Sequence, residues 1–537
     1  MKALGFRQAN AWLHTWAGLL LGWLLYAVFL TGTLSFFQEE ITFWMKPEQH
    51  AATPDNQTPQ RLAQRMQTLA PDAAQWTITL PSERNSAARA QWFDVGQPVV
   101  KKGGQSLTLD PGTAEPIDDR ATRGGGFLYR FHFELYAMPR VLARWIVGIA
   151  TMVMLVAIVS GVITHKKIFK DFFTFRPRKG QRSWLDAHNA TAVLALPFHL
   201  MITYSGLLLL MFMLMPWAVE SAYKGDTQAF FNESGGRGSR APTPDAARPP
   251  TPQHQDAPLT DLAPLLAQAN QRWTRGVASI SVTHPGKTNA VIELRERGGD
   301  SLIDRGNSER MRFDGVNGTL LKSPATPPIS ATNAVYNVFS SMHLIRFAGP
   351  PLRWFFFLSG VLGTAMIATG LVLWVVKRLP ERQKMGRTPV GHRWVEVLNV
   401  GTIAGLPLAI AAYFWANRLL PAGMAQRSDW EIRCFFIVWL LCLIHPLLRA
   451  HKRAWLEQLV LGAVLFATLP LFNFTFEHSH LLASVARGQW LLAGMDLTLL
   501  ASAVLLAYSA WKLNRHQPAQ RVQRQPRTAS VIQERAA

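Results

Sequence analysis

The sequence predicts a polytopic α-helical membrane protein with about eight transmembrane helices, two small external α+β domains and an internal duplication. Three observations support this fold class. Hydrophobic residues make up 49% of the 537-residue chain and gather in runs near the length that crosses a bilayer. Two long segments between these runs share one order of expected helix and strands. Two histidine-containing motifs each occur twice.

Eight apolar runs are expected to form transmembrane helices, because each has roughly the 20 residues needed to cross the hydrocarbon layer. The first run is too long for a cleaved signal sequence and lacks a small-residue cleavage site, so we interpret it as the first helix of the mature protein. The expected helices lie at about 12–37, 144–164, 190–217, 353–376, 395–416, 431–448, 455–474 and 489–511.

The positive charge is interpreted as a membrane-orientation signal rather than a nucleic-acid surface. The formal net charge is +21, and the basic residues cluster in short loops that the helix count places on one side. Both chain ends and these loops are therefore expected to be cytoplasmic, with the long insertions in the periplasm of a bacterial inner membrane. The loop cations are Lys166, Lys167, Lys170, Arg176, Arg178, Lys179, Arg182, Lys377, Arg378, Arg382, Lys384, Arg387, Arg449, Lys452 and Arg453; Lys2, Arg7 and the tail from Lys512 add to them.

The two cysteines limit the chemistry of the external segments. Cys434 and Cys442 both fall inside one expected helix, so the external segments carry no disulfide and no thiolate metal site. Iron–sulfur clusters and zinc–thiolate sites are therefore excluded as the basis of function.

The two external segments read as copies of one α+β unit. The first has an amphipathic stretch at 59–70, strands at 75–80 and 90–95 and a hairpin at 106–117. The second has a helix near 259–273, strands near 277–283 and 289–296, and a hairpin at 311–321. The expected organisation is 10–37 (first helix), 40–131 (first external domain), 132–165 (second helix), 166–187 (basic loop), 188–217 (third helix), 218–257 (a linker, partly disordered), 258–342 (second external domain), 343–376 (fourth helix), 377–394 (loop), 395–511 (four-helix C-terminal module) and 512–537 (basic tail).

The duplication is clearest around four histidines at the edges of expected helices. In one motif a histidine precedes a hydroxyl–glycine pair, with 18 residues from histidine to glycine; in the other, histidine is followed by proline, Arg-Trp and a hydroxyl–glycine pair. An imidazole at a membrane edge is costly, so four at repeated positions favour paired ligands. The first motif is His14 with Thr31-Gly32 and His188 with Ser205-Gly206; the second is His132, Pro139, Arg144-Trp145 and Ser160-Gly161, repeated as His343, Pro350, Arg353-Trp354 and Thr369-Gly370.

Over residues 10–378 the chain resembles the PepSY-associated transmembrane helix proteins, and within them the inner-membrane ferric-siderophore reductases. The matching motifs are Trp12-Leu-His14-Thr-Trp16-Ala-Gly18, Asp186-Ala-His188-Asn and Pro197-Phe-His199-Leu-Met-Ile-Thr-Tyr-Ser-Gly206, together with the two external domains. The resemblance implies four helices carrying two PepSY domains, two b-type haems, and electron transfer outward to iron held by a siderophore. The helices at 395–511 lie outside this resemblance.

The repeated histidines are expected to bind haem in two pairs. If the halves are related by an axis along the membrane normal, His14 meets His188 at the cytoplasmic edge and His132 meets His343 at the external edge. Haem iron takes two axial imidazoles in this way, whereas zinc prefers a tetrahedral cluster. The alternative is that these are ordinary interfacial side chains.

Two further histidines leave the inner pairing open. His165 ends the second helix, and His199 lies 11 residues, or roughly 16 Å of helix, beyond His188 on nearly the same face. Either could be an alternative ligand of the inner haem, and His199 could serve a third haem or simply bond to a helix backbone. Haem propionates need cationic partners, for which the candidates are Arg140, Arg144, Arg346 and Arg353, although each can also be an ordinary interfacial arginine.

These patterns predict a membrane di-haem ferric-siderophore reductase. No cytoplasmic loop is long enough for a flavin or Rossmann domain, so electrons must come from membrane quinol or a separate cytoplasmic donor. Reduction to Fe(II) weakens binding by hard oxygen ligands and would release the iron. The alternative function is a PepSY-based partner-binding or regulatory membrane protein without redox activity; a third possibility keeps the haems but changes the acceptor to flavin, copper or another periplasmic species.

Overall fold

The structure is a computed structural model that describes residues 5–99, 103–165, 170, 172, 174–177, 179–226, 255–298, 301–303, 308–321 and 329–516. Most of the expected linker at 218–257 and of the basic tail at 512–537 lies outside these residues. The same holds for the cations at positions 2, 166, 167 and 178.

The described chain is that of a polytopic helical membrane protein, which confirms the predicted fold class. It contains seven helical spans that are long and apolar enough to cross a membrane, and a bent pair of helices forms an eighth. The unbroken spans are α1 (Phe6–Ser35), α5 (Arg140–Thr164), α14 (Pro350–Met385), the unit formed by α15 (Val390–Asn399), a π-turn (Val400–Ala404) and α16 (Gly405–Leu419), then α17 (Arg427–Leu448), α18 (His451–Phe472) and α20 (Trp490–Arg515).

The third expected helix is broken, so the prediction of one continuous helix over 190–217 was wrong. It consists of α7 (Gln181–Leu194) and α8 (Leu196–Leu209), whose axes differ by 67°. Pro197 occupies the first turn of α8, where its missing N–H and its ring are tolerated, but the preceding helix cannot continue through it. Short helices α9 (Met211–Leu214) and α10 (Trp217–Tyr223) follow.

The two external units share a single antiparallel sheet, with strand order β4-β3-β2-β1-β5-β6-β7-β8. The equivalent strands β1 and β5 pair at the centre, where Ile78 lies opposite Ile280. Helices α3 and α12 pack on one face of the sheet through a common apolar core. The bounds are α3 (Thr58–Leu69), β1 (Ala73–Thr79), β2 (Ala88–Asp94), β3 (Gln105–Leu109), β4 (Pro116–Ile117), α12 (Leu262–Arg272), β5 (Val277–Thr283), β6 (Val291–Glu296), β7 (Arg310–Asp314) and β8 (Leu320–Leu321).

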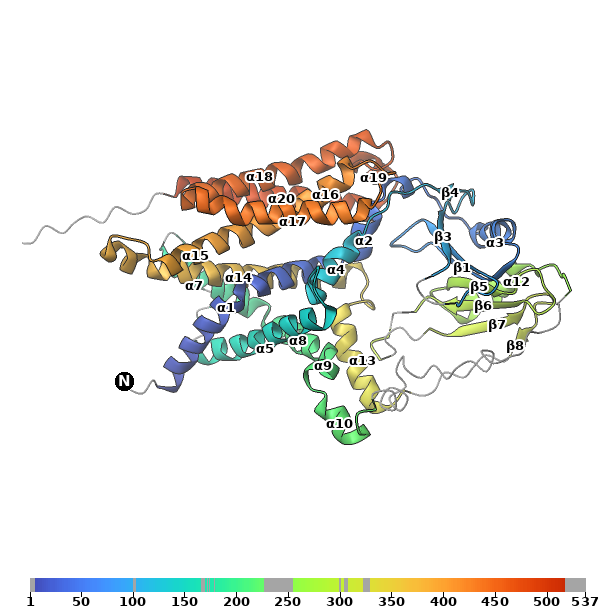
Figure 1. Ribbon diagram of the computed structural model, residues 1–537, viewed down its shortest axis with the longest axis horizontal. Helices are drawn as coiled ribbons and strands as arrows, with labels where there is room; N and C mark the ends of the chain where they lie inside the picture. The colour runs from blue at the N-terminus through green and yellow to red at the C-terminus, as the bar shows by residue number, and fades with distance from the viewer. Residues whose placement is uncertain are drawn as a thin grey trace, which may run out of the picture.

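The sheet lies beyond one end of the long helices (Figure 1), and we call that end the sheet side and the other the distal side. Shorter helices occupy the sheet side, where α4 and α13 each precede a long helix. Helix α1 packs against α4, α5 and α14, while α8 packs against α5 and α13. The short elements are α2 (Gln38–Trp44), a 3-10 turn (Pro47–Gln49), α4 (Gly125–Glu134), α13 (Ala331–Leu344), a second 3-10 turn (Asn473–Thr475) and α19 (Leu481–Ala486).

Candidate functional site

The four repeated histidines lie in two facing pairs at opposite ends of the helices. On the distal side, the ring centroids of His14 on α1 and His188 on α7 are 6.1 Å apart. On the sheet side, those of His132 on α4 and His343 on α13 are also 6.1 Å apart. Each half of the duplicated chain therefore contributes one imidazole to each pair.

This separation suits a metal ion held between two imidazoles. A metal–nitrogen bond of roughly 2 Å on each side, plus about 1 Å from each nitrogen to its ring centre, gives roughly 6 Å between centroids. Among the described residues, no three or more His, Cys, Asp or Glu side chains gather as a metal cluster. The donor set offered at each end is thus a pair of imidazoles.

Each ring is oriented by a hydrogen bond at Nδ1. In three cases Nδ1 donates to a backbone carbonyl, and His343 Nδ1 instead lies 2.9 Å from Ser205 Oγ. A proton fixed on Nδ1 leaves the lone pair of Nε2 for a ligand, as in metal sites whose histidines are oriented by a second hydrogen bond. The carbonyl bonds are His14 to Ala157 (2.8 Å), His132 to Val28 (2.7 Å) and His188 to Met366 (2.9 Å).

The repeated glycines form the surfaces against which the histidines pack. A Cβ at Gly32 would lie 2.6 Å from two atoms of the His132 ring. The other three glycines stand in the same relation to a histidine, because each repeat unit places one helix's glycine against the next helix's imidazole. A Cβ would approach His14 to 3.0 Å at Gly161, His188 to 3.1 Å at Gly370 and His343 to 3.2 Å at Gly206.

Sequence reasoning used these glycines only as markers of the repeat and assigned them no role. The carbonyl acceptors of the three backbone-bonded rings lie four residues before a glycine, at Val28, Ala157 and Met366. One helical turn thus supplies both the gap and the acceptor. The fixed spacing of histidine and glycine in both motifs was the signal available in the sequence.

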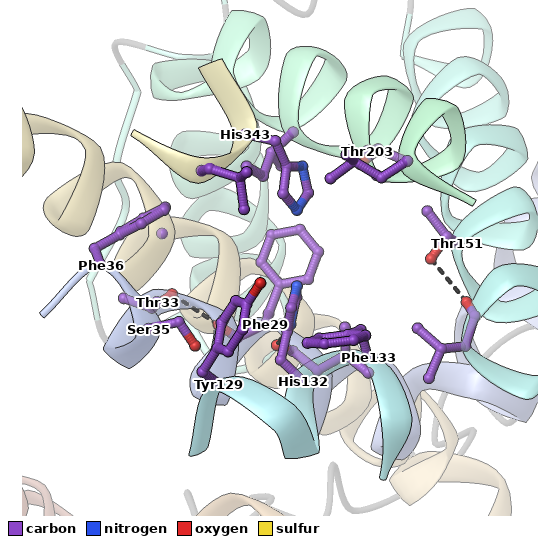
Figure 2. A pocket seen from close by; sticks show the side chains of 18 of the residues that line it. Phe29, Thr33, Ser35, Phe36, Tyr129, His132, Phe133, Thr151, Thr203 and His343 are labelled. Carbon is purple, nitrogen blue, oxygen red and sulfur yellow. Dashed lines mark hydrogen bonds between the residues drawn. The ribbon is translucent and has the colours of Figure 1, made fainter. Parts of the chain in front are cut away.

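A cavity of about 330 Å³ separates His132 from His343. The two imidazoles point toward each other across it, and Phe29, Tyr129 and Phe133 line it with aromatic surface (Figure 2). Thr203 also lines the cavity, and its buried hydroxyl has no hydrogen-bond partner in the described structure. The cavity is mostly apolar, with a few polar groups, as cofactor sites generally are.

Two of the four candidate arginines line this cavity. Arg144 reaches it while also pairing with Glu134 at 2.5 Å. Arg346 lines it too, and within the described residues no carboxylate pairs with it. The cavity thus has a cationic rim next to the histidine pair.

The other two candidate arginines have other partners. Arg140 is largely exposed and lies 3.2 Å from Glu134. Arg353, the repeat equivalent of Arg144, is buried and pairs with Glu40 at 2.7 Å. Neither contributes to the cavity lining. Sequence reasoning did not single out Glu40, whose carboxylate also binds Arg84 at 2.5 Å.

The two additional histidines occupy different environments. His165 caps the end of α5. His199 is fully buried on α8, where its ring packs edge-to-face against Phe29 and Phe198. The bend between α7 and α8 takes His199 off the helix that carries His188, so the expectation that the two share one helix face was wrong.

The family profile of the PepSY-associated TM region matches residues 11–377, about two thirds of the chain. The match includes all four paired histidines and both halves of the sheet and ends within α14. The helices from α15 to α20 lie beyond it. None of the curated proteins matches the chain.

Proposed function

The chain belongs to the PepSY-associated transmembrane family, and on this premise we propose that it is a di-haem electron-transfer protein that reduces ferric siderophores. The observation that carries the proposal is the pair of facing imidazoles at each end of the helices, with centroids 6.1 Å apart in both cases. Two neutral imidazoles presented from opposite sides are the axial ligands of a b-type haem.

The residues at the sheet side fit such a group in size and chemistry. His132 and His343 would hold the iron, and the aromatic lining would contact the macrocycle. Arg346 and Arg144 would balance the anionic propionates with charge-assisted hydrogen bonds. On the distal side His14 and His188 would hold a second haem through the same Nδ1 arrangement.

When bound, the two haems would supply one-electron carriers that side chains cannot provide. The protein fixes their spacing. Helix α1 carries His14 near one end and Gly32, which contacts His132, 18 residues later. At about 1.5 Å per residue this places the two pairs roughly 27 Å apart along the helix, near the thickness of a hydrocarbon core.

The charge of the loops gives the proposed direction. The distal side carries the basic loops, so the distal side would be cytoplasmic and the sheet periplasmic. Electrons from membrane quinol or a cytoplasmic donor would enter at His14 and His188. A ferric chelate docked near the sheet would take one electron and become Fe(II), which oxygen ligands bind less tightly.

Spectroscopy of purified variants tests the proposal. The unmodified protein should bind about two haems per chain and show b-type bands in a reduced-minus-oxidised spectrum. His132→Ala or His343→Ala should remove one haem and abolish reduction of a ferric hydroxamate. His478→Ala is the matched control, because its imidazole also lies on the sheet side but does not line the cavity. Full haem content and full activity in both cavity variants would refute the assignment.

A further inference from the structure

The C-terminal helices bind the segment that connects the sheet to α4. This segment, residues 118–124, follows β4 and is called the strap below. Four of its residues make hydrogen bonds to α16 or α17, which lie outside the family match. The bonds are Arg120 Nη1 to the Asn417 carbonyl (2.7 Å), Arg427 Nη1 to the Ala121 carbonyl (2.9 Å), Thr122 Oγ1 to Glu431 Oε2 (2.6 Å) and Tyr413 Oη to the Gly124 carbonyl (3.0 Å).

The groups that hold the strap are themselves fixed. Arg427 and Glu431 form an ion pair at 2.5 Å in which both side chains are fully buried. Asn417 Nδ2 donates to the same carboxylate at 2.8 Å. A buried charged network is stable only when its members are all satisfied, so these residues have little freedom to move.

Helix α4 itself packs against the same two helices. The Phe127 ring lies 5.1 Å from Tyr413 and 5.1 Å from Phe435. Phe131, the residue before His132, lies 5.9 Å from Phe435 and also contacts Trp439. The apolar face of α4 is thus fixed by aromatic contacts, while the adjacent His132 points toward the cavity.

The equivalent helix in the second half is held differently. On α13, Asn337 and Ser341 bond to the carbonyls of residues 303 and 302, and Phe339 packs against Tyr204 of α8. All these partners come from the second half of the duplication. The two imidazoles of the sheet-side pair are therefore supported by unrelated parts of the chain.

We propose that the C-terminal helices are a clamp that positions His132 for the sheet-side haem, with Tyr413 and Glu431 as positioning residues acting through the strap. This inference rests on the proposed function for its purpose, but the clamp itself is a property of the protein. It assigns a role to helices that lie outside the family match.

Hydrogen exchange of the full-length protein tests the clamp without reference to haem. Tyr413→Phe combined with Thr122→Val removes two of the four strap bonds while keeping the ring and the side-chain shape. Amides of residues 125–134 should then exchange at least about tenfold faster, because each lost bond contributes a free energy of order RT or more. Trp415→Phe is the matched control: it loses a hydrogen bond to the Leu465 carbonyl within the C-terminal helices and does not touch the strap.

The haem signals provide the second readout. The double variant should shift the midpoint potential and weaken retention of the haem that His132→Ala removes, with the other haem unchanged. Unchanged exchange at 125–134, or equal acceleration in Trp415→Phe, would overturn the clamp. If the unmodified protein binds no haem, the proposed function fails, while the exchange comparison alone still decides whether the clamp exists.

Discussion

Substitution of alanine for Gly32 tests whether the repeated glycines position the imidazoles. The added Cβ would lie 2.6 Å from Cε1 and Nδ1 of His132, whereas an ordinary contact begins near 3.4 Å. The ring must therefore retreat by about 0.8 Å. That movement strains its 2.7 Å bond to the Val28 carbonyl and exceeds the roughly 0.2 Å tolerance of a metal–nitrogen bond.

The expected loss is substantial but not complete. Overpacking of this kind costs about 2 kcal/mol, which corresponds to roughly thirtyfold weaker haem binding at the sheet-side pair. The four glycines should form a graded series, because the clash distance increases from 2.6 Å at Gly32 to 3.0, 3.1 and 3.2 Å at the other three. The strongest effect is expected for Gly32→Ala and the weakest for Gly206→Ala.

The assay is haem content per chain with a reduced-minus-oxidised spectrum, measured alongside thermal unfolding. Gly18→Ala is the control, because Gly18 lies on the same helix and a Cβ there meets nothing within 4 Å. Alanine at that position should be neutral or slightly stabilising. Loss of haem in Gly18→Ala, or an unaltered sheet-side haem in Gly32→Ala, would refute the reasoning.

Three further predictions concern the surroundings of the pairs. Burial lowers the pKa of His50 to about 3, so the stability that its neutral ring contributes is complete above about pH 6.5 and is lost as the pH falls toward 3; thermal unfolding at pH 4 and 7 should show a drop of about 3 kcal/mol that His50→Gln does not show. Arg353→Met should lower the free energy of unfolding by about 3 kcal/mol, because it leaves the buried Glu40 without one of its partners, yet haem content should stay at the unmodified level. Arg346→Gln should weaken haem retention several-fold by titration with added haem, whereas equal weakening in Arg140→Gln would contradict a specific role for the cavity arginine.

The helical fold followed from hydropathy, but the break in the third span did not. An apolar run over 190–217 has the length and composition of a straight helix, and hydropathy is insensitive to a single Pro197. The backbone is sensitive, because proline removes one helical hydrogen bond and clashes with the preceding turn. Counting 11 residues from His188 to His199 on one helix therefore misplaced the second ring relative to the first.

The joined sheet was also beyond the sequence pattern. Alternating residues identified the strands, since the period of two marks which side chains are buried. The same alternation is compatible with two separate sheets or with one. The pairing of β1 with β5 depends on two equivalent edges meeting across the duplication axis, which is a tertiary contact.

The arginines show the same limit at the level of side chains. Arg144 and Arg353 occupy equivalent places in the repeat, so sequence spacing gave them equal claims to the cavity. In the structure the nearest carboxylate decides: Glu40 of α2 takes Arg353, and Glu134 of α4 binds Arg144 at the cavity edge. Neither glutamate belongs to the repeated motifs.

The duplication explains why the two pairs need the whole chain. Each half supplies one imidazole to each end, so a single half would leave every ring without its partner. The surroundings have meanwhile diverged: the position equivalent to His199 in the first half is Leu25, and only α4 is held by the C-terminal helices. Equal ring spacings at the two ends therefore coexist with unequal packing around them. For two carriers in series this is useful, because burial and neighbouring charge tune the potential of each haem while its ligands stay the same.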